Sequence, residues 1–417
     1  MSPTTRVLIG LAAGAALGLA LDALHPEFAV RVADIAQPLG RLWLNALQMT
    51  VVPLVLALIV VGVNTATDAA ASGRVAQRAI LVFIVILAGG ALLAAFAAPS
   101  IFALFPRSPA LAAALGKTVA GPASAVAPMG WADWFNGIVP SNAIMAAAQS
   151  AMLPTVVFAL FFGFALTRIE AARRALVVNF FQAIADVMIV VVRWVLWAAP
   201  AGVFALILAV CARAGLHMLG ALGIYVLVEC LLYLAVTLLM LPVAVLWGGE
   251  RIRRFVAALA PAQIVALSTQ SSLASMPAML ESAGARLGYP QHVNALVLPM
   301  AVSLFRLTSP VQYVTSACFI AWAFGIELGA AQLVLGALLA VVISLGSVGL
   351  PGQVSFMATN LPVAQAMGVP VGPLGLMLAV DTLPDALATL GNVTADLTAV
   401  SVVAKQVAAD AAAAERA

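Results

Sequence analysis

The last long apolar stretch of the chain carries polar side chains at helical spacing. It reads "AVDTLPDALATLGNVTADLTAV", and its polar residues, at i, i+4, i+8, i+11 and i+15, are Asp381, Asp385, Thr389, Asn392 and Asp396. At about 100° per residue they fall within an arc of roughly 80° on one helix face. An aspartate at the centre of a membrane helix costs about 2.5–3.5 kcal/mol, so this face is expected to point into protein. Ionisable groups within the membrane are candidate functional residues, and an interior ion-pair network that only holds helices together is the alternative.

A permanent positive charge lies within another apolar stretch. Arg306 is the centre of "SLFRLTSP", with no other Lys, Arg, Asp or Glu between Arg286 and Glu327. Pro310 has no N–H to bond the carbonyl four residues earlier, which is that of Arg306, so a helix is weakened at the charge. We therefore expect Arg306 and the aspartates of the last stretch to lie close together.

The composition indicates a polytopic membrane protein. Of 417 residues, 64% are hydrophobic and 8% charged, whereas soluble domains carry roughly 25% charged residues. The basic residues are scattered, so the bilayer and a small molecule are expected partners and nucleic acid is not. Three cysteines in apolar stretches predict neither disulfides nor a metal site. The three histidines lie in loops or near a span end, so no catalytic base for Ser271 or Ser272 is evident and no enzyme is predicted.

Stretches of about 20 apolar residues predict membrane-spanning helices. Six are clear, the first expected to be retained rather than cleaved as a signal peptide: 6–24, 42–66, 77–99, 146–167, 194–212 and 218–247. Two later stretches, 253–286 and 328–368, are broken by "STQSSLASMP" and "GSVGLPGQ". Residues 290–324 lie between them, and 369–404 end the membrane part.

Basic residues orient these spans, because Lys and Arg favour the cytoplasmic side. A cytoplasmic N-terminus places twelve inside, namely Arg6, Arg74, Arg78, Arg168, Arg173, Arg174, Arg251, Arg253, Arg254, Arg286, Lys405 and Arg416. It places five outside, namely Arg31, Arg41, Arg107, Lys117 and Arg213, with Arg193 and Arg306 uncounted. This cytoplasmic excess of Lys and Arg supports the topology only if both broken stretches are re-entrant hairpins, the first open to the cytoplasm and the second to the exterior. Such hairpins around a central site are typical of inverted-repeat secondary transporters; two kinked helices are the alternative.

Several segments resemble the dicarboxylate/amino acid:cation symporters, the glutamate-transporter family, over essentially the whole chain. They are "QMTVVPLVLALIVVGV" (48–63), "IVPSNAIMAAAQSAMLPTVVFALFFGFAL" (138–166), "APAGVFAL" (199–206), "SSLASMP" (271–277), "GLPG" (349–352) and "DTLPDALATLGNVTAD" (381–396). The resemblance implies an all-α membrane protein with eight spans, two re-entrant helical hairpins, inverted repeats and an elevator-type transporter fold.

The resemblance also implies a homotrimer with two domains per chain. The scaffold and trimerisation domain would comprise 1–76 and 100–217, with spans 1, 2, 4 and 5. The transport domain would comprise 77–99 and 218–404, with spans 3, 6, 7 and 8 and both hairpins. Residues 405–417 would be a short cytoplasmic helical tail. The expected location is the inner (plasma) membrane of a bacterium, multi-pass, with both termini cytoplasmic.

Site residues follow from the resemblance position by position. Asp385 stands where amino-acid carriers bind the substrate ammonium, and Asp396 fits a sodium-binding carboxylate. Contacts to substrate or hairpin tips are implied for Ser271, Ser272, Gly349, Gly352, Thr389 and Asn392. Ala388 stands where carriers of acidic amino acids have an arginine, and Gln270 where some bacterial members have one at the serine tip. The NMDGT stretch is replaced by Phe305, Arg306, Leu307, Thr308 and Ser309.

Three interpretations of Arg306 are open. It stands in for a bound cation beside Asp385 or Asp396, it binds a substrate carboxylate bidentately, or it forms a static ion pair in a homologue that no longer transports. Phe305 and Leu307 supply no oxygen ligands, so sodium is not expected and no cofactor is predicted. Buried carboxyl groups favour their proton-carrying form, which makes Asp381, Asp396 and Glu229 candidates for proton coupling. Asp385 with Ala388 favours a neutral amino acid, and a dicarboxylate or acidic amino acid is the alternative.

Overall fold

The computed structural model describes residues 3–71, 73–107, 138–346 and 352–414, and this part of the chain is helical without strands. In chain order the first helices are α1 (Pro3–Leu24), α2 (Pro26–Gln48), α3 (Val51–Ala71), α4 (Arg74–Phe102), α7 (Ala143–Ala148), α8 (Met152–Leu166), α9 (Ala171–Trp197), α10 (Ala199–Ala214) and α11 (Leu216–Leu246). They are followed by α12 (Ile252–Thr269), α13 (Ser272–Glu281), the π-helical turn η1 (Ser282–Arg286), α14 (Gln291–Leu304), α15 (Thr308–Phe324), α16 (Ala330–Gly346), α17 (Gly352–Ala366), α18 (Leu374–Val380) and α19 (Thr382–Ala414).

The helices have the length and surface of membrane spans. Among the described residues, seven helical stretches are long and apolar enough to cross a bilayer, and α8, α10 and α16 are shorter apolar helices. Large apolar side chains point outward, for example Leu176, Trp194 and Trp197 on α9. The prediction of an all-α multi-pass membrane protein is confirmed.

Two predicted spans are wrong in their bounds because helices break inside them. Residues 42–66 contain the junction of α2 and α3 at Met49–Thr50, and α2 already begins at Pro26. Arg31 and Arg41, which the orientation count placed outside, lie within this helix. Residues 146–167 contain a turn between α7 and α8, where Ser150 adopts a left-handed φ of 54°.

Helix α9 was missed as an element. The prediction of one span over 194–212 joins the end of α9 to α10, whereas the chain breaks at Ala198, just before Pro200. The first half of α9 carries Arg173, Arg174 and Gln182, and these polar residues mask an otherwise apolar helix. Residues 405–414 are also not a separate tail, because α19 continues through them; Arg78 of α4 forms an ion pair of 2.5 Å with Asp410 there.

Both predicted hairpins are present. Helices α12 and α13 pack against each other around a turn at Gln270, whose φ of 51° is left-handed. Helices α16 and α17 pack in the same way, and the residues between them, 347–351, lie outside the described part of the chain. Residues 290–324 are two helices, α14 and α15, separated by a break at Phe305–Leu307.

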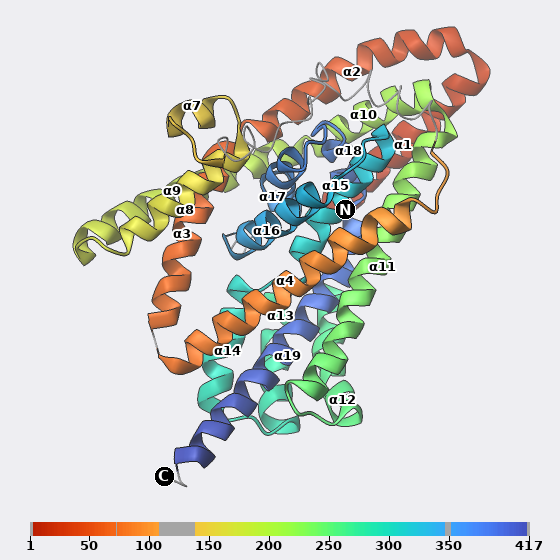
Figure 1. The fold of residues 1–417 in the computed structure, drawn as a ribbon. Coiled ribbons are helices and arrows are strands. Elements are labelled where there is room, and N and C mark those ends of the chain that lie inside the picture. The colour runs from red at the N-terminus through yellow and green to blue at the C-terminus, as the bar shows by residue number, and fades with distance from the viewer. Residues whose placement is uncertain (1–2, 72, 108–137, 347–351, 415–417) are drawn as a thin grey trace.

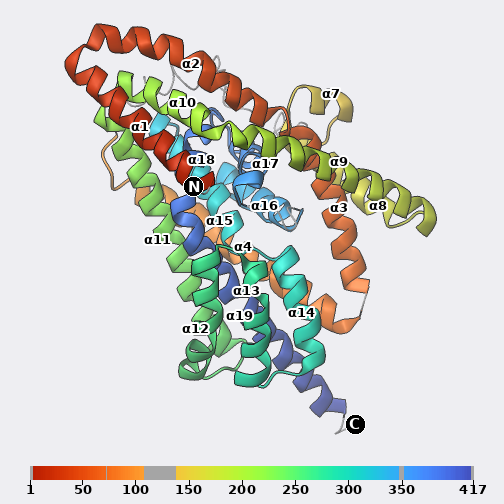
Figure 2. The same cartoon turned by 180° about the vertical axis from the view of Figure 1, so that it is seen from behind.

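Packing sorts the helices into two groups. In the first, α1 and α2 pack on α10, and α3 packs on α8 and α9. In the second, the long helices α4, α11 and α19 surround α14 and α15 (Figures 1 and 2). The hairpin α12–α13 lies at the end that holds the C-terminus, away from α2 and α10. The hairpin α16–α17 bridges the groups, because it packs on α4 and α15 and also on α3 and α8.

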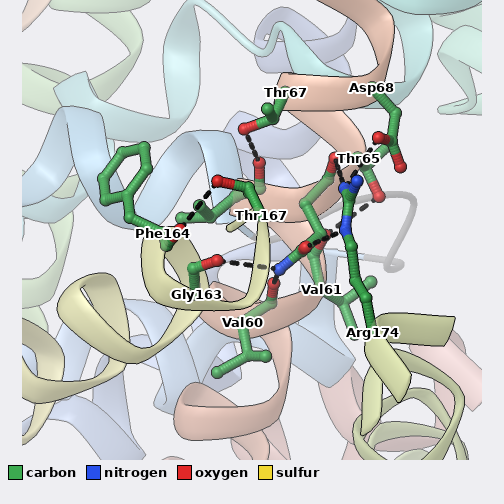
Figure 3. A network of polar contacts seen from close by, with 11 residues as sticks. Val60, Val61, Thr65, Thr67, Asp68, Gly163, Phe164, Thr167 and Arg174 are labelled. Atoms are coloured by element: carbon green, nitrogen blue, oxygen red, sulfur yellow. Dashed lines mark hydrogen bonds and ion pairs between the residues drawn. The ribbon is translucent and has the colours of Figure 1, made fainter. Parts of the chain in front are cut away.

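A polar network fixes α3, α8 and α9 to one another (Figure 3). Asn64 is buried on α3, and its amide nitrogen donates to the carbonyls of Val60 (2.9 Å) and Gly163 (3.2 Å). Its amide oxygen accepts from Nε of Arg174 (2.8 Å), and the same guanidinium bonds Asp68 at 2.7 Å. A polar side chain buried with all its bonds satisfied specifies one arrangement of the helices around it.

Candidate functional site

The break between α14 and α15 places Arg306 inside the second group of helices. Phe305 is extended, with φ −120° and ψ 102°, so the helix ends before the arginine. The carbonyl of Arg306 accepts a hydrogen bond from the N–H of Ser309 (3.0 Å) and one from the hydroxyl of Ser344 (3.4 Å). The helix is thus interrupted more strongly at Arg306 than Pro310 predicted. The carbonyl of Arg306, to which Pro310 cannot donate, accepts hydrogen bonds from other groups.

Helix α19 is attached to this break by hydrogen bonds. The N–H and the hydroxyl of Thr308 both donate to Oδ1 of Asn392 at 3.0 Å, and the hydroxyl lies 3.3 Å from the carbonyl of Ala388. Gly391 permits this approach, since a Cβ there would lie 2.8 Å from the Thr308 methyl and 2.7 Å from Oγ1 of Thr237. The first residue of α15 is therefore held directly by the polar face of α19.

The polar face of α19 points into the protein. Asp381, at the junction of α18 and α19, is 3% exposed, Asp396 is fully buried, and Asp385 is half-buried. Thr389 is also buried, and its hydroxyl donates to the carbonyl of Asp385 (2.9 Å) within its own helix. The half-buried Arg306 interacts electrostatically with the carboxyl groups of Asp381, Asp385 and Asp396.

Asp396 is the least solvated of these carboxyl groups. Both of its oxygens are buried, and neither accepts a hydrogen bond from a described residue. A buried, unpaired charge is costly, so a carboxyl group in this position needs a bound proton or a nearby positive charge. Burial disfavours the charged form of this carboxyl group, and the charge of Arg306 in the neighbouring helix break acts in the opposite direction.

Glu229 and Asp381 form an acidic pair next to the other carboxyl groups of α19. Glu229 of α11 is fully buried and accepts a hydrogen bond from the hydroxyl of Tyr233 at 2.9 Å, while its other oxygen has no partner among the described residues. Asp381 accepts from Nε2 of Gln312 at 2.5 Å. The two carboxyl groups repel each other when both are charged, and Gln312 lies beside both. The sequence alone indicated Glu229 and Asp381 as candidate residues but did not predict that they lie together. Gln312, which lies beside both, belongs to no motif.

Apolar side chains surround the remaining sides of the break. Phe83 of α4 stacks on Phe305 with ring centroids 4.7 Å apart, and Leu307 packs against Gly90 of α4. Sodium prefers a shell of several oxygen ligands, as other hard cations do. The side chains of Phe83, Phe305 and Leu307 supply none, and the guanidinium would repel the ion. The residues at this break do not fit a bound sodium ion.

The described part of the chain contains only some of the predicted hairpin-tip residues. Ser271 caps α13, and its hydroxyl accepts from the N–H of Ala274 (3.2 Å), so this oxygen is engaged locally. Ser272 begins α13 and is half-buried, and Gly352 begins α17. Gly349 lies outside the described residues. Ala388 is buried on α19 and offers no polar group to a ligand.

Two helical hairpins together with buried charges among apolar helices are typical of a membrane transport protein. The chain belongs to the sodium:dicarboxylate symporter family, whose model matches residues 4–406. It is a secondary transporter with the elevator-type fold of that family, and it is not an enzyme.

Relatives differ in the solutes that they are named for. The chain is 30% identical to the proton/glutamate-aspartate symporter of Escherichia coli (strain K12), over 96% of this chain and 92% of that protein. It is 29% identical to the proton/sodium-glutamate symport protein of Bacillus caldotenax, over 96% and 93%. It is 30% identical to the neutral amino acid transporter B(0) of Oryctolagus cuniculus, over 93% of this chain and 77% of that protein.

Because α19 packs closely on the helix break, one added methyl group at Gly391 should strongly lower the stability of the protein. In Gly391→Ala the new Cβ meets Thr237 and Thr308 at less than 3.0 Å, so we expect a loss of about 1–3 kcal/mol from overpacking. The measurement is the melting temperature of the purified protein in detergent. Gly223→Ala on α11 is the control, since nothing lies within 4 Å of its Cβ. Equal melting temperatures for the two variants would contradict the packing described here.

Proposed function

We propose that this transporter carries a small neutral amino acid across the inner membrane of a bacterium, without sodium and coupled to protons, with Arg306 in the role of a bound cation. The observation that carries the proposal is the position of Arg306, in a helix break whose charge acts on three carboxyl groups of α19. A tethered cation compensates these carboxylates permanently, so no ion has to be taken up for that purpose.

The acidic pair of Glu229 and Asp381 supports proton coupling. Two carboxyl groups facing each other away from water cannot both ionise cheaply, so one proton shared between them is favoured. Gln312 and Tyr233 donate hydrogen bonds to the two acids and hold them in place. The relatives named proton symporters are consistent with this kind of coupling.

The substrate preference rests on Asp385 and Ala388. Asp385 is the half-buried carboxyl group of the cluster, so a ligand can reach it, and an ammonium group is the partner that suits it. Ala388 provides no charge for the second carboxylate of an acidic amino acid. A relative named as a neutral amino acid transporter supports this choice.

The unequal surroundings of the two hairpins support an elevator movement. The hairpin α12–α13 packs mainly on α11, α14 and α19, all in the second group of helices, whereas α16–α17 also packs on α3 and α8 of the first group. We infer that residues 77–99 and 218–404 move as a unit against 1–76 and 100–217, and that this structure is one end state. A homotrimer of such chains, with both termini cytoplasmic, completes the proposal.

Within the proposed function, the first prediction concerns sodium. Proteoliposomes holding the purified protein should take up a radiolabelled neutral amino acid equally in sodium and choline buffers, because Arg306 already supplies the positive charge. Strong stimulation by sodium would refute the tethered-cation role. Arg306→Ala extends the test: it should lose activity or become dependent on an added cation, and a fully active variant that ignores cations would be inconsistent with that role.

The second prediction concerns the substrate. Asp385→Asn should weaken binding of neutral amino acids about tenfold to hundredfold, since a hydrogen bond to a charged group contributes about 1.5–3 kcal/mol. Isothermal titration calorimetry measures the affinity, and Asp186→Asn, at an exposed position of α9, is the control. Unchanged affinity for amino acids, or binding of dicarboxylates only, would move the assignment to dicarboxylates.

The third prediction concerns protons. An acidic exterior should accelerate net uptake by the wild type, and Glu229→Gln should abolish this acceleration while exchange of labelled for unlabelled substrate persists. Retained exchange shows that the variant is folded and still moves its substrate. Glu281→Gln, which removes an exposed carboxylate of α13, serves as the matched control. A Glu229→Gln protein that still responds to the proton gradient would eliminate this residue as the coupling site.

A further inference from the structure

A cavity of about 270 Å³ lies between α1, α2, α9, α10 and α18. Two arginines and two tryptophans contribute to its lining, and the remaining side chains are apolar. The lining residues are Arg6, Val7, Trp43, Arg193, Leu196, Trp197, Ala199, Pro200, Val203, Leu378 and Ala379. Such a combination of charge and apolar wall is unlike a site for a small hydrophilic solute.

The two arginines have no acidic partner within the described part of the chain. The other ion pairs of the first helix group show the contrast: Arg174 pairs with Asp68, and Arg213 pairs with Asp34. Arg6 and Arg193 take part in no hydrogen bond or ion pair with a described residue, although both line one cavity. Two like charges on the lining of one largely apolar cavity suit an anion that no described residue supplies.

The walls of the cavity suit hydrocarbon. Val7, Val203 and Leu378 are each less than 10% exposed, so the interior is formed by tightly packed apolar side chains. Trp43 is buried with its indole N–H bonded to the carbonyl of Val195 (3.0 Å), which fixes the ring against Gly202. Trp197 is 81% exposed, as expected for a tryptophan at the boundary between lipid and water.

A second apolar surface adjoins this cavity. Trp43 also lines a groove of about 780 Å³ between α2, α9 and α10, whose other lining residues are aliphatic, small or aromatic. Ile35, Leu39 and Trp194 in this groove are more than 60% exposed. Hydrocarbon that leaves the cavity past Trp43 therefore meets a continuous apolar surface.

We propose that the cavity is a binding site for an anionic phospholipid, with the phosphate between Arg6 and Arg193 and an acyl chain against Val7, Val203 and Leu378. The charge selects an anionic headgroup over a zwitterionic one, because two unpaired guanidinium groups gain more from a net negative charge. The apolar walls select a lipid over inorganic phosphate, since hydrocarbon burial adds to the charge interaction.

Native mass spectrometry of the delipidated full-length protein, titrated with phosphatidylglycerol and with phosphatidylcholine, tests the proposal. The wild type should bind one phosphatidylglycerol more tightly than phosphatidylcholine. Arg6→Gln and Arg193→Gln should each weaken that binding about fivefold and the double variant about thirtyfold, from the effect expected for each basic residue at a lipid surface. These arginines are exposed, so the substitutions leave the helix packing intact.

The matched control is Arg251→Gln with Arg253→Gln, which removes two exposed charges at the start of α12 outside this cavity. It should bind phosphatidylglycerol like the wild type. Equal loss in the control pair would show a general surface-charge effect and overturn the site, as would unchanged binding in the Arg6/Arg193 double variant. Displacement of phosphatidylglycerol by millimolar inorganic phosphate would show an anion site without lipid specificity and would also overturn the proposal.

Discussion

The structure depends on one electrostatic arrangement, a fixed positive charge facing buried carboxyl groups across a helix break. Arg306 lies where neither α14 nor α15 is regular, and its charge acts on Asp381, Asp385 and Asp396 of the polar face of α19. Without it, Asp396 would hold a charge with no hydrogen bond from the described residues. Because burying such a charge is costly, Asp396 needs a bound proton or a nearby positive charge.

The rest of the second helix group keeps this arrangement in place. Thr308 binds Asn392 twice, Gly391 allows α19 to approach, and the stacked rings of Phe83 and Phe305 close the side toward α4. The chain belongs to the sodium:dicarboxylate symporter family, and an arginine lies at this helix break.

Both groups of helices expose large apolar side chains, for example Phe96 of α4, Leu238 of α11 and Trp194 of α9. The first group also borders a groove and a cavity beside Trp43. Arg6 and Arg193 border the cavity at one end of α1 and α9. The cavity also borders α18, because Leu378 and Ala379 form part of its wall.

The sequence by itself determined the membrane class, the helical polar face of residues 381–396, the two hairpins and the weak point at Arg306, because each depends on local composition or spacing. It did not determine where α2, α7 and α9 begin and end, since breaks at Thr50, Ser150 and Ala198 occur within apolar sequence that has no clear boundary. Only the tertiary structure brought Gln312 to both Glu229 and Asp381, stacked Phe83 on Phe305 and placed Arg193 and Arg6 on the lining of one cavity. Those contacts join residues far apart in the chain, and the packing of whole helices decides them.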